Sequence, residues 1–127
     1  MDAPSSQRSR LTAEDASGLA PSGLWELVDG RVVSVSPAGA RHGDVVARVT
    51  RLLANFVDAR RLGKVLAGDA GFILRRDPDT VRAPDVAFVT AARLPGRPPA
   101  EFMSGAPDLA IEIISPNFEV RLPDLWS

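Results

Sequence analysis

Residues 83–89 read APDVAFV and residues 108–116 read DLAIEIISP. Both runs predict buried strands, yet an acid lies inside each apolar stretch, Asp85 in the first and Glu112 in the second. An ionised carboxylate in such surroundings is costly unless it is paired, hydrogen-bonded or bound to a cation. Two of them on neighbouring strands would suit Mg²⁺ or Mn²⁺, because these ions prefer oxygen ligands. Spacing alone leaves an alternative open, in which Asp85 caps a turn and Glu112 bonds to backbone or to an arginine.

A hairpin and a long helix are predicted upstream of these runs. Residues 24–28 (LWELV) and 31–35 (RVVSV) flank Asp29-Gly30. Asp-Gly between two β-prone runs is typical of a type I′ hairpin turn, because glycine accepts the positive φ that this turn requires. Between residues 42 and 61 the apolar side chains recur at helical spacing, which predicts an amphipathic helix that Gly63 ends.

A second, shorter helix is predicted near the start of the chain. Thr12 is followed three positions later by Asp15, a pattern typical of a helix N-terminus. The helix is expected over about residues 12–17 and to end at Gly18, with the turn-forming Pro-Ser-Gly of residues 21–23 beyond it.

The remaining strands surround the two acids. They are expected at residues 65–67, 72–74, 81–89 and 109–114. Pro84 lacks a backbone donor and therefore marks an edge, a strand start or a bulge. The last strand is almost continuously apolar and is expected to be central in the sheet, whereas the proline-rich residues 90–107 predict a loop. The fold class is α/β, an α+β arrangement with one long helix packed on a mixed sheet.

Length and composition predict a single domain. The chain has 127 residues, no cysteine and a net charge of −1. We expect a disordered tail at residues 1–10, the domain at 11–117 and a divergent C-terminal tail at 118–127. The charge shows no global basic field for nucleic acid, and no disulfide is available. The sequence contains no apolar run of about 18 residues and no signal region, so we expect a cytoplasmic protein without a membrane segment.

An ordered set of motifs resembles a known family. The set comprises LTAED (11–15), WELVDGRVV (25–33), His42, APDV (83–86) and DLAIEIISP (108–116). In this order they resemble the Uma-type family of restriction-endonuclease-like proteins, in register over about residues 11–117. That family belongs to the Pro-Asp…(Asp/Glu)-x-Lys nuclease superfamily, which implies a mixed four-stranded sheet flanked by helices.

The resemblance implies roles for particular residues. Asp85 and Glu112 take the metal-ligand positions, and Glu26 and His42 match family residues that could reach the same cleft. The implied activity is Mg²⁺- or Mn²⁺-dependent hydrolysis of phosphodiester bonds in DNA. Glu26 could equally lie on a solvated hairpin face, and His42 could be a hydrogen-bonding residue at the helix start or a proton carrier.

The chain departs from the family at its lysine. The superfamily position two residues after Glu112 is Ile114. In Uma-type proteins the resemblance instead implies a lysine on a helix about a dozen residues after the Ser-Pro, but residues 118–127 contain none. The only lysine of the chain, Lys64, matches neither position. The family's last helix and strand are expected to be missing, so the sequence reads as C-terminally truncated. We therefore expect weak activity or none, because losing one preorganised charge typically costs about 10²–10³ in rate.

Two other function classes stay open. The first is a non-catalytic module that binds nucleic acid or protein through arginines on or near the long helix. These arginines are Arg41, Arg48, Arg51, Arg60 and Arg61. The second is a remnant of a truncated gene. Dimers are common in the superfamily, so a homodimer is among the expected assemblies, although no motif identifies an interface.

Overall fold

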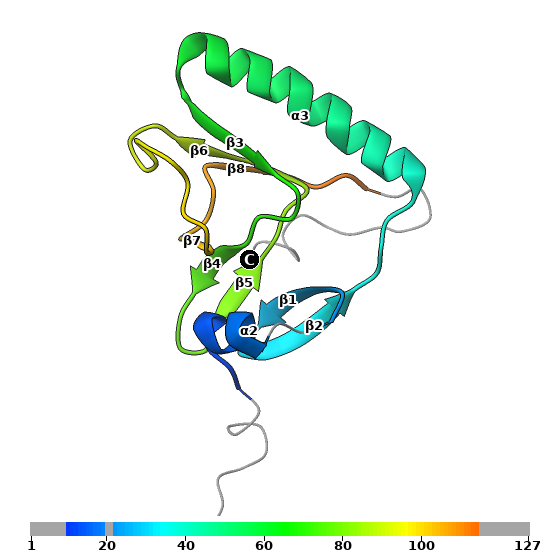
Figure 1. Cartoon of the computed structure of the whole chain (residues 1–127), viewed down its shortest axis with the longest axis vertical. Helices are drawn as coiled ribbons and strands as arrows, with labels where there is room; N and C mark the ends of the chain where they lie inside the picture. The colour runs from blue at the N-terminus through cyan, green and yellow to red at the C-terminus, as the bar shows by residue number, and fades with distance from the viewer. Residues whose placement is uncertain (1–9, 20–21, 115–127) are drawn as a thin grey trace, which may run out of the picture.

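The computed structural model describes residues 10–19 and 22–114 (Figure 1). The predicted tails at residues 1–10 and 118–127 lie outside this part, apart from Arg10, as does the Ser-Pro pair after Ile114. The described elements are α2 (Ala13–Leu19), β1 (Leu24–Val28), β2 (Arg31–Val35), α3 (Ala40–Arg60), β3 (Gly63–Ala67), β4 (Phe72–Arg75), β5 (Thr80–Arg82), β6 (Val86–Thr90), β7 (Met103–Ser104) and β8 (Leu109–Ile111). The α+β class with a mixed sheet is confirmed.

The strands form two sheets. The first has the order β2-β1-β5-β4-β7 and is mixed, because β7 runs parallel to β4. The second has the order β3-β6-β8 and is antiparallel in its described pairs. Helix α2 lies against the first sheet, and α3 runs along the second (Figure 1). The predicted single sheet is therefore divided in two.

The division falls inside the strand predicted at residues 81–89. β5 ends at Arg82 in the first sheet and β6 begins at Val86 in the second. Pro84 lies between them, is fully buried and has no N–H group for a ladder. Three residues, 83–85, thus carry the chain from one sheet to the other, and Asp85 lies at the join.

The central position predicted for the last strand is wrong. In the described part of the chain β8 pairs with β6 alone, and Leu109 is 43% exposed. The central strand is β6, which pairs with β3 and β8 and buries Val86, Ala87 and Val89. A continuous apolar run indicates burial, but it does not specify how many neighbours a strand has.

The long helix α3 is confirmed, with a different C-terminal residue. It ends at Arg60, and Arg61 rather than a glycine adopts the left-handed conformation (φ 53°), so that its N–H group bonds the Asp58 carbonyl. Gly63 has another role, because a Cβ atom there would lie 2.0 Å from the Val89 carbonyl oxygen. Neither described helix is long and apolar enough to cross a membrane.

Local signals at the first hairpin and at α2 are confirmed. Asp29 and Gly30 both have positive φ, 49° and 78°, as a type I′ turn requires. The Asp15 N–H group donates to Thr12 Oγ1 at 3.0 Å, and Thr12 N–H donates back to Asp15 Oδ2 at 3.1 Å. The helix then continues through Gly18 to Leu19, so Gly18 does not end it.

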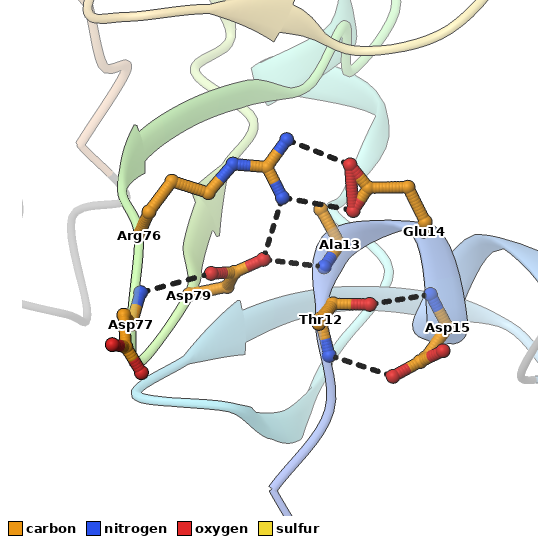
Figure 2. A network of polar contacts seen from close by, with 7 residues as sticks. All are labelled: Thr12, Ala13, Glu14, Asp15, Arg76, Asp77 and Asp79. Atoms are coloured by element: carbon orange, nitrogen blue, oxygen red, sulfur yellow. Dashed lines mark hydrogen bonds and ion pairs between the residues drawn. The ribbon is translucent and has the colours of Figure 1, made fainter.

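A polar network fixes α2 to the turn between β4 and β5 (Figure 2). We call Arg76, Glu14 and Asp79 the anchor network. Arg76 binds both oxygens of Glu14, at 2.8 and 2.7 Å, and reaches Asp79 at 2.8 Å. Asp79 is 5% exposed and also accepts the N–H groups of Ala13 and Asp77. Its carboxylate therefore holds the first turn of α2.

Two apolar clusters complete the core. One joins α2 to the first sheet and contains Ala13, Ala16, Leu27 and Val81. The other bridges the two sheets and contains Phe72, Ala87, Val89, Leu94 and Met103. Because Phe72 belongs to the first sheet and Ala87 to the second, this packing fixes the relative position of the two sheets at the residue 83–85 connection.

Candidate active site

Strand register brings the two predicted ligands together. In the β6–β8 ladder Val86 lies opposite Ile111. The strands are antiparallel, so the residue before Val86 faces the residue after Ile111. These two residues are Asp85 and Glu112, just beyond the end of the ladder. Their proximity is also clear from the effect of Asp85 on the ionisation of Glu112. Two carboxylates in such a position repel each other unless a proton or a cation intervenes.

Asp85 is held by two hydrogen bonds. The Ile113 N–H group donates to Asp85 Oδ2 at 2.7 Å, and His42 Nε2 lies 3.1 Å from Asp85 Oδ1. His42 comes from the first turn of α3, so the helix start reaches the join between the sheets. The two side chains are 23% and 16% exposed, which leaves the pair open to solvent on one side. Each carboxylate oxygen still has a second lone pair for a cation.

Glu26 enters the site from the other sheet. Leu27 lies opposite Val81, so the adjacent Glu26 and Arg82 are neighbours on the opposite face from the Leu27–Val81 core. Arg82 Nη1 lies 3.3 Å from Glu26 Oε1, and the Ala83 N–H group donates to Glu26 Oε2 at 2.8 Å. Glu26 thus fixes the start of the connection that carries Asp85.

The ionisation of Glu112 is disfavoured by burial and by neighbouring negative charge. Burial first, then the charges of Asp85 and Glu26 and a side-chain hydrogen bond with Asp85, raise the pKa of Glu112 to about 7. The positive charge of Arg82 opposes this rise. We call Glu26, His42, Arg82, Asp85 and Glu112 the acid site. The partly buried position of Glu112, together with carboxylates that outnumber the one arginine, means that near neutral pH this residue retains a proton for much of the time.

The donor chemistry of the acid site fits a hard divalent cation. Carboxylate oxygens are the ligands of Mg²⁺ and Mn²⁺, and the pKa of Glu112 is raised by burial and then by the charges of Asp85 and Glu26, which a cation would offset. Within residues 10–19 and 22–114, however, no three His, Asp or Glu side chains converge closely enough to form a metal-binding group. Two protein ligands, Asp85 and Glu112, would therefore be completed by water or substrate, as is usual for Mg²⁺.

Comparison with known proteins identifies the family. The sequence model of Uma2, a family described as a putative restriction endonuclease, matches residues 13–122. The chain belongs to the Uma2 family. No curated protein matches the chain.

A solved structure has the same fold as this Uma2 chain. It is a crystal structure of a putative nuclease belonging to DUF820 from Anabaena variabilis, with a TM-score of 0.63 at 18% identity. The alignment covers 86% of this chain and 61% of that one, so the Uma2 chain spans less than two thirds of the solved protein. At this identity the match supports the fold rather than the chemistry.

All four predicted site residues lie around the join between the sheets, but one charged member was missed. Arg82 was not singled out, because the only signal for it is its pairing with Glu26, 56 residues earlier in the chain. Lys64 pairs with Val89, at the far end of β6 from Asp85. Ile114, at the superfamily's lysine position, is 56% exposed.

Proposed function

We propose that this protein is a divalent-metal-dependent nuclease that hydrolyses phosphodiester bonds of DNA, with Asp85 and Glu112 as the metal ligands. The observation that carries the proposal is the facing pair of these two carboxylates, in which the pKa of Glu112 is raised to about 7. A cation between them would remove the repulsion that now keeps a proton on Glu112. Membership of the Uma2 family supports the nuclease assignment.

His42 is the proposed proton carrier. An ionised Asp85 can only accept a hydrogen bond, so the neutral His42 ring would carry its proton on Nε2, 3.1 Å from Asp85. That tautomer leaves Nδ1 as an acceptor for a proton from the attacking water. Asp85 would then both bind the cation and fix the ring of the base, in the way that a second group orients the base of other hydrolases.

The bound cation would supply Lewis-acid chemistry, lowering the pKa of water and offsetting phosphate charge. The chain's own side chains would position the reactants, Glu26 by holding Ala83 and Asp85 by holding His42. The activity is proposed to be weak, because neither Ile114 nor the residues after it in this sequence supply the lysine that the family resemblance implies.

The test is calorimetric titration with Mn²⁺ of the wild-type chain and of Asp85→Asn. We expect the heat of binding to disappear in Asp85→Asn, since the amide is neutral and donates on one side. The matched control is Asp108→Asn. Asp108 lies beyond the opposite end of the β6–β8 ladder, where its carboxylate accepts the Thr90 N–H group at 2.9 Å.

Unchanged Mn²⁺ binding by Asp85→Asn would overturn the metal assignment. If no variant binds Mn²⁺ while all of them bind a DNA duplex, the non-catalytic binding module becomes the better function. Circular dichroism of each variant distinguishes loss of the site from loss of the fold.

A further inference from the structure

Arg82 is the arginine of the acid site, and within the described part of the chain most of its donors have no partner. It lies at the end of β5, three residues before Asp85, and its side chain is 23% exposed. Among the described residues its guanidinium makes one hydrogen bond, the 3.3 Å contact with Glu26. A guanidinium has five N–H donors, so most of those of Arg82 are available to an incoming acceptor.

Two other arginines behave differently, although both are more exposed than Arg82. Arg76 binds both oxygens of Glu14 and one of Asp79. Arg93 donates to the backbone carbonyls of Ala106 and Ser104 and lies 3.4 Å from Asp108. Both use their donors to join segments of the fold, whereas Arg82 has one long contact with a carboxylate that also binds Ala83.

We propose that Arg82 binds the phosphate group of a nucleic acid at the acid site, with Glu26 as the positioning residue that holds it there. This inference rests on the proposed nuclease function and adds the anion-binding residue that the function lacks. The carboxylates of the acid site would repel a phosphodiester, and only one divalent ion, held by Asp85 and Glu112, would offset them. A planar guanidinium with free donors matches phosphate oxygens in a way that no other side chain of the site does.

The role is electrostatic and does not involve proton transfer. A guanidinium does not act as a general base in proteins, so Arg82 cannot replace a lysine in that role. It can replace the positive charge that Ile114 lacks at the superfamily's lysine position. Its place between Glu26 and the connection to Asp85 keeps this charge beside the ligand pair.

The experiment compares Arg82→Gln with Arg97→Gln, a loop arginine that is exposed and undergoes the same change in net charge. The probe is a fluorescein-labelled DNA duplex, titrated by anisotropy in EDTA over a range of NaCl concentrations. We expect Arg82→Gln to reduce the slope of log K against log salt by about 0.9, the value for one lost phosphate contact. Arg97→Gln should leave the slope unchanged.

A second variant separates charge from folding. Arg82→Lys keeps the charge and should keep the salt slope, while cleavage with Mn²⁺ falls because the fork geometry is lost. Low, non-denaturing guanidinium chloride should restore part of the cleavage by Arg82→Ala and none of the cleavage by Asp85→Asn, an outcome that a merely structural role would not produce.

The outcomes distinguish a failure of the Arg82 inference from a failure of the proposed nuclease function. If the wild-type chain binds and cleaves the duplex but Arg82→Gln keeps the wild-type salt slope, the role of Arg82 is overturned and the nuclease function stands. If the wild-type chain does not bind the duplex at low salt, the nuclease function fails and the phosphate role fails with it.

Discussion

The anchor network and the acid site contain the same kinds of side chain but differ in their balance of charge. In the anchor network Arg76 serves two acids, and Asp79 also accepts two backbone N–H groups. Burial opposes the ionisation of Asp79, but the N–H groups of Ala13 and Asp77 and the Arg76 guanidinium outweigh it and lower its pKa. In the acid site burial and neighbouring acids raise the pKa of Glu112 to about 7.

This difference separates a structural cluster from a candidate active site. A network whose acids are stabilised as anions contributes to folding at neutral pH and has little affinity left for a ligand. A cluster whose acids are destabilised as anions lowers the free energy of unfolding when no cation is bound. Binding of a cation can restore that free energy. The sign of the pKa shift carries this information, and the residue types alone do not.

The largest expected effect is on the anchor network. Asp79→Ala should lower the free energy of unfolding by about 2–4 kcal/mol at neutral pH, because it leaves the Ala13 N–H group and Arg76 without their buried partner. The pKa of Asp79 is lowered, so its contribution is present above the ordinary carboxyl range and is lost as pH falls through the folded-state value. Urea unfolding at several pH values measures both effects.

The control for this loss is Asp44→Ala. The Asp44–Arg48 pair on α3 is exposed on both sides, at 61% and 68%, so its removal should cost less than about 0.5 kcal/mol. Equal losses for Asp79→Ala and Asp44→Ala would mean that the anchor network contributes no more than a surface pair. A difference between Asp79→Ala and wild type that persists at low pH would contradict the assigned pKa direction.

The second effect has the opposite sign and belongs to the acid site. A raised carboxyl pKa favours folding below the unfolded-state value, and this contribution is lost as pH rises through about 7. Glu112→Gln cannot ionise, so in EDTA it should be more stable than wild type above pH 7, on the order of 1–3 kcal/mol. The two proteins should be equally stable at a pH below the ordinary glutamate range.

Thermal unfolding across this pH range tests the effect, with the exposed Glu101→Gln as the charge-matched control. If Glu112→Gln and wild type give parallel curves, Glu112 is not protonated in the folded state. In a separate measurement without EDTA, addition of Mn²⁺ should stabilise the wild type and not Glu112→Gln. This result would connect the pH effect to the proposed role of Glu112 as a metal ligand.

Local patterns predicted the elements, because their causes lie within a few residues. The turn needs only Asp29 and Gly30, and the start of α2 needs only Thr12 and Asp15. The stripe of apolar residues in α3 is likewise a property of one segment. These features were predicted correctly because no distant residue decides them.

Tertiary pairing could not be predicted in the same way. Apart from Pro84, residues 81–89 agree with a continuous strand, and Pro84 alone allowed an edge, a strand start or a bulge. The division between two sheets depends on distant partners, β1 and β4 for β5 and β3 and β8 for β6. Apolar surroundings left the pairing of Asp85 and Glu112 as one of two alternatives, and the family resemblance implied it. Arg82 became visible only once β1 and β5 were paired. The anchor network joins residues 62 positions apart and has no local signal.

Among the changes within the two clusters, the smallest expected change in stability comes from His42→Ala. It removes one hydrogen bond to Asp85, but the Ile113 N–H group remains bonded to the other oxygen at 2.7 Å, so the free energy of unfolding should fall by only about 0.5–1.5 kcal/mol. The rate of DNA cleavage should fall far more, by about 10²–10⁴ if His42 carries the proton. Asn55→Ala, an exposed change on the same helix, is the control for both readouts. A loss of stability as large as that of Asp79→Ala would place His42 among the structural contacts and remove the contrast between the two clusters. Unchanged cleavage would instead assign proton transfer to another group and leave Asp85 as a ligand alone.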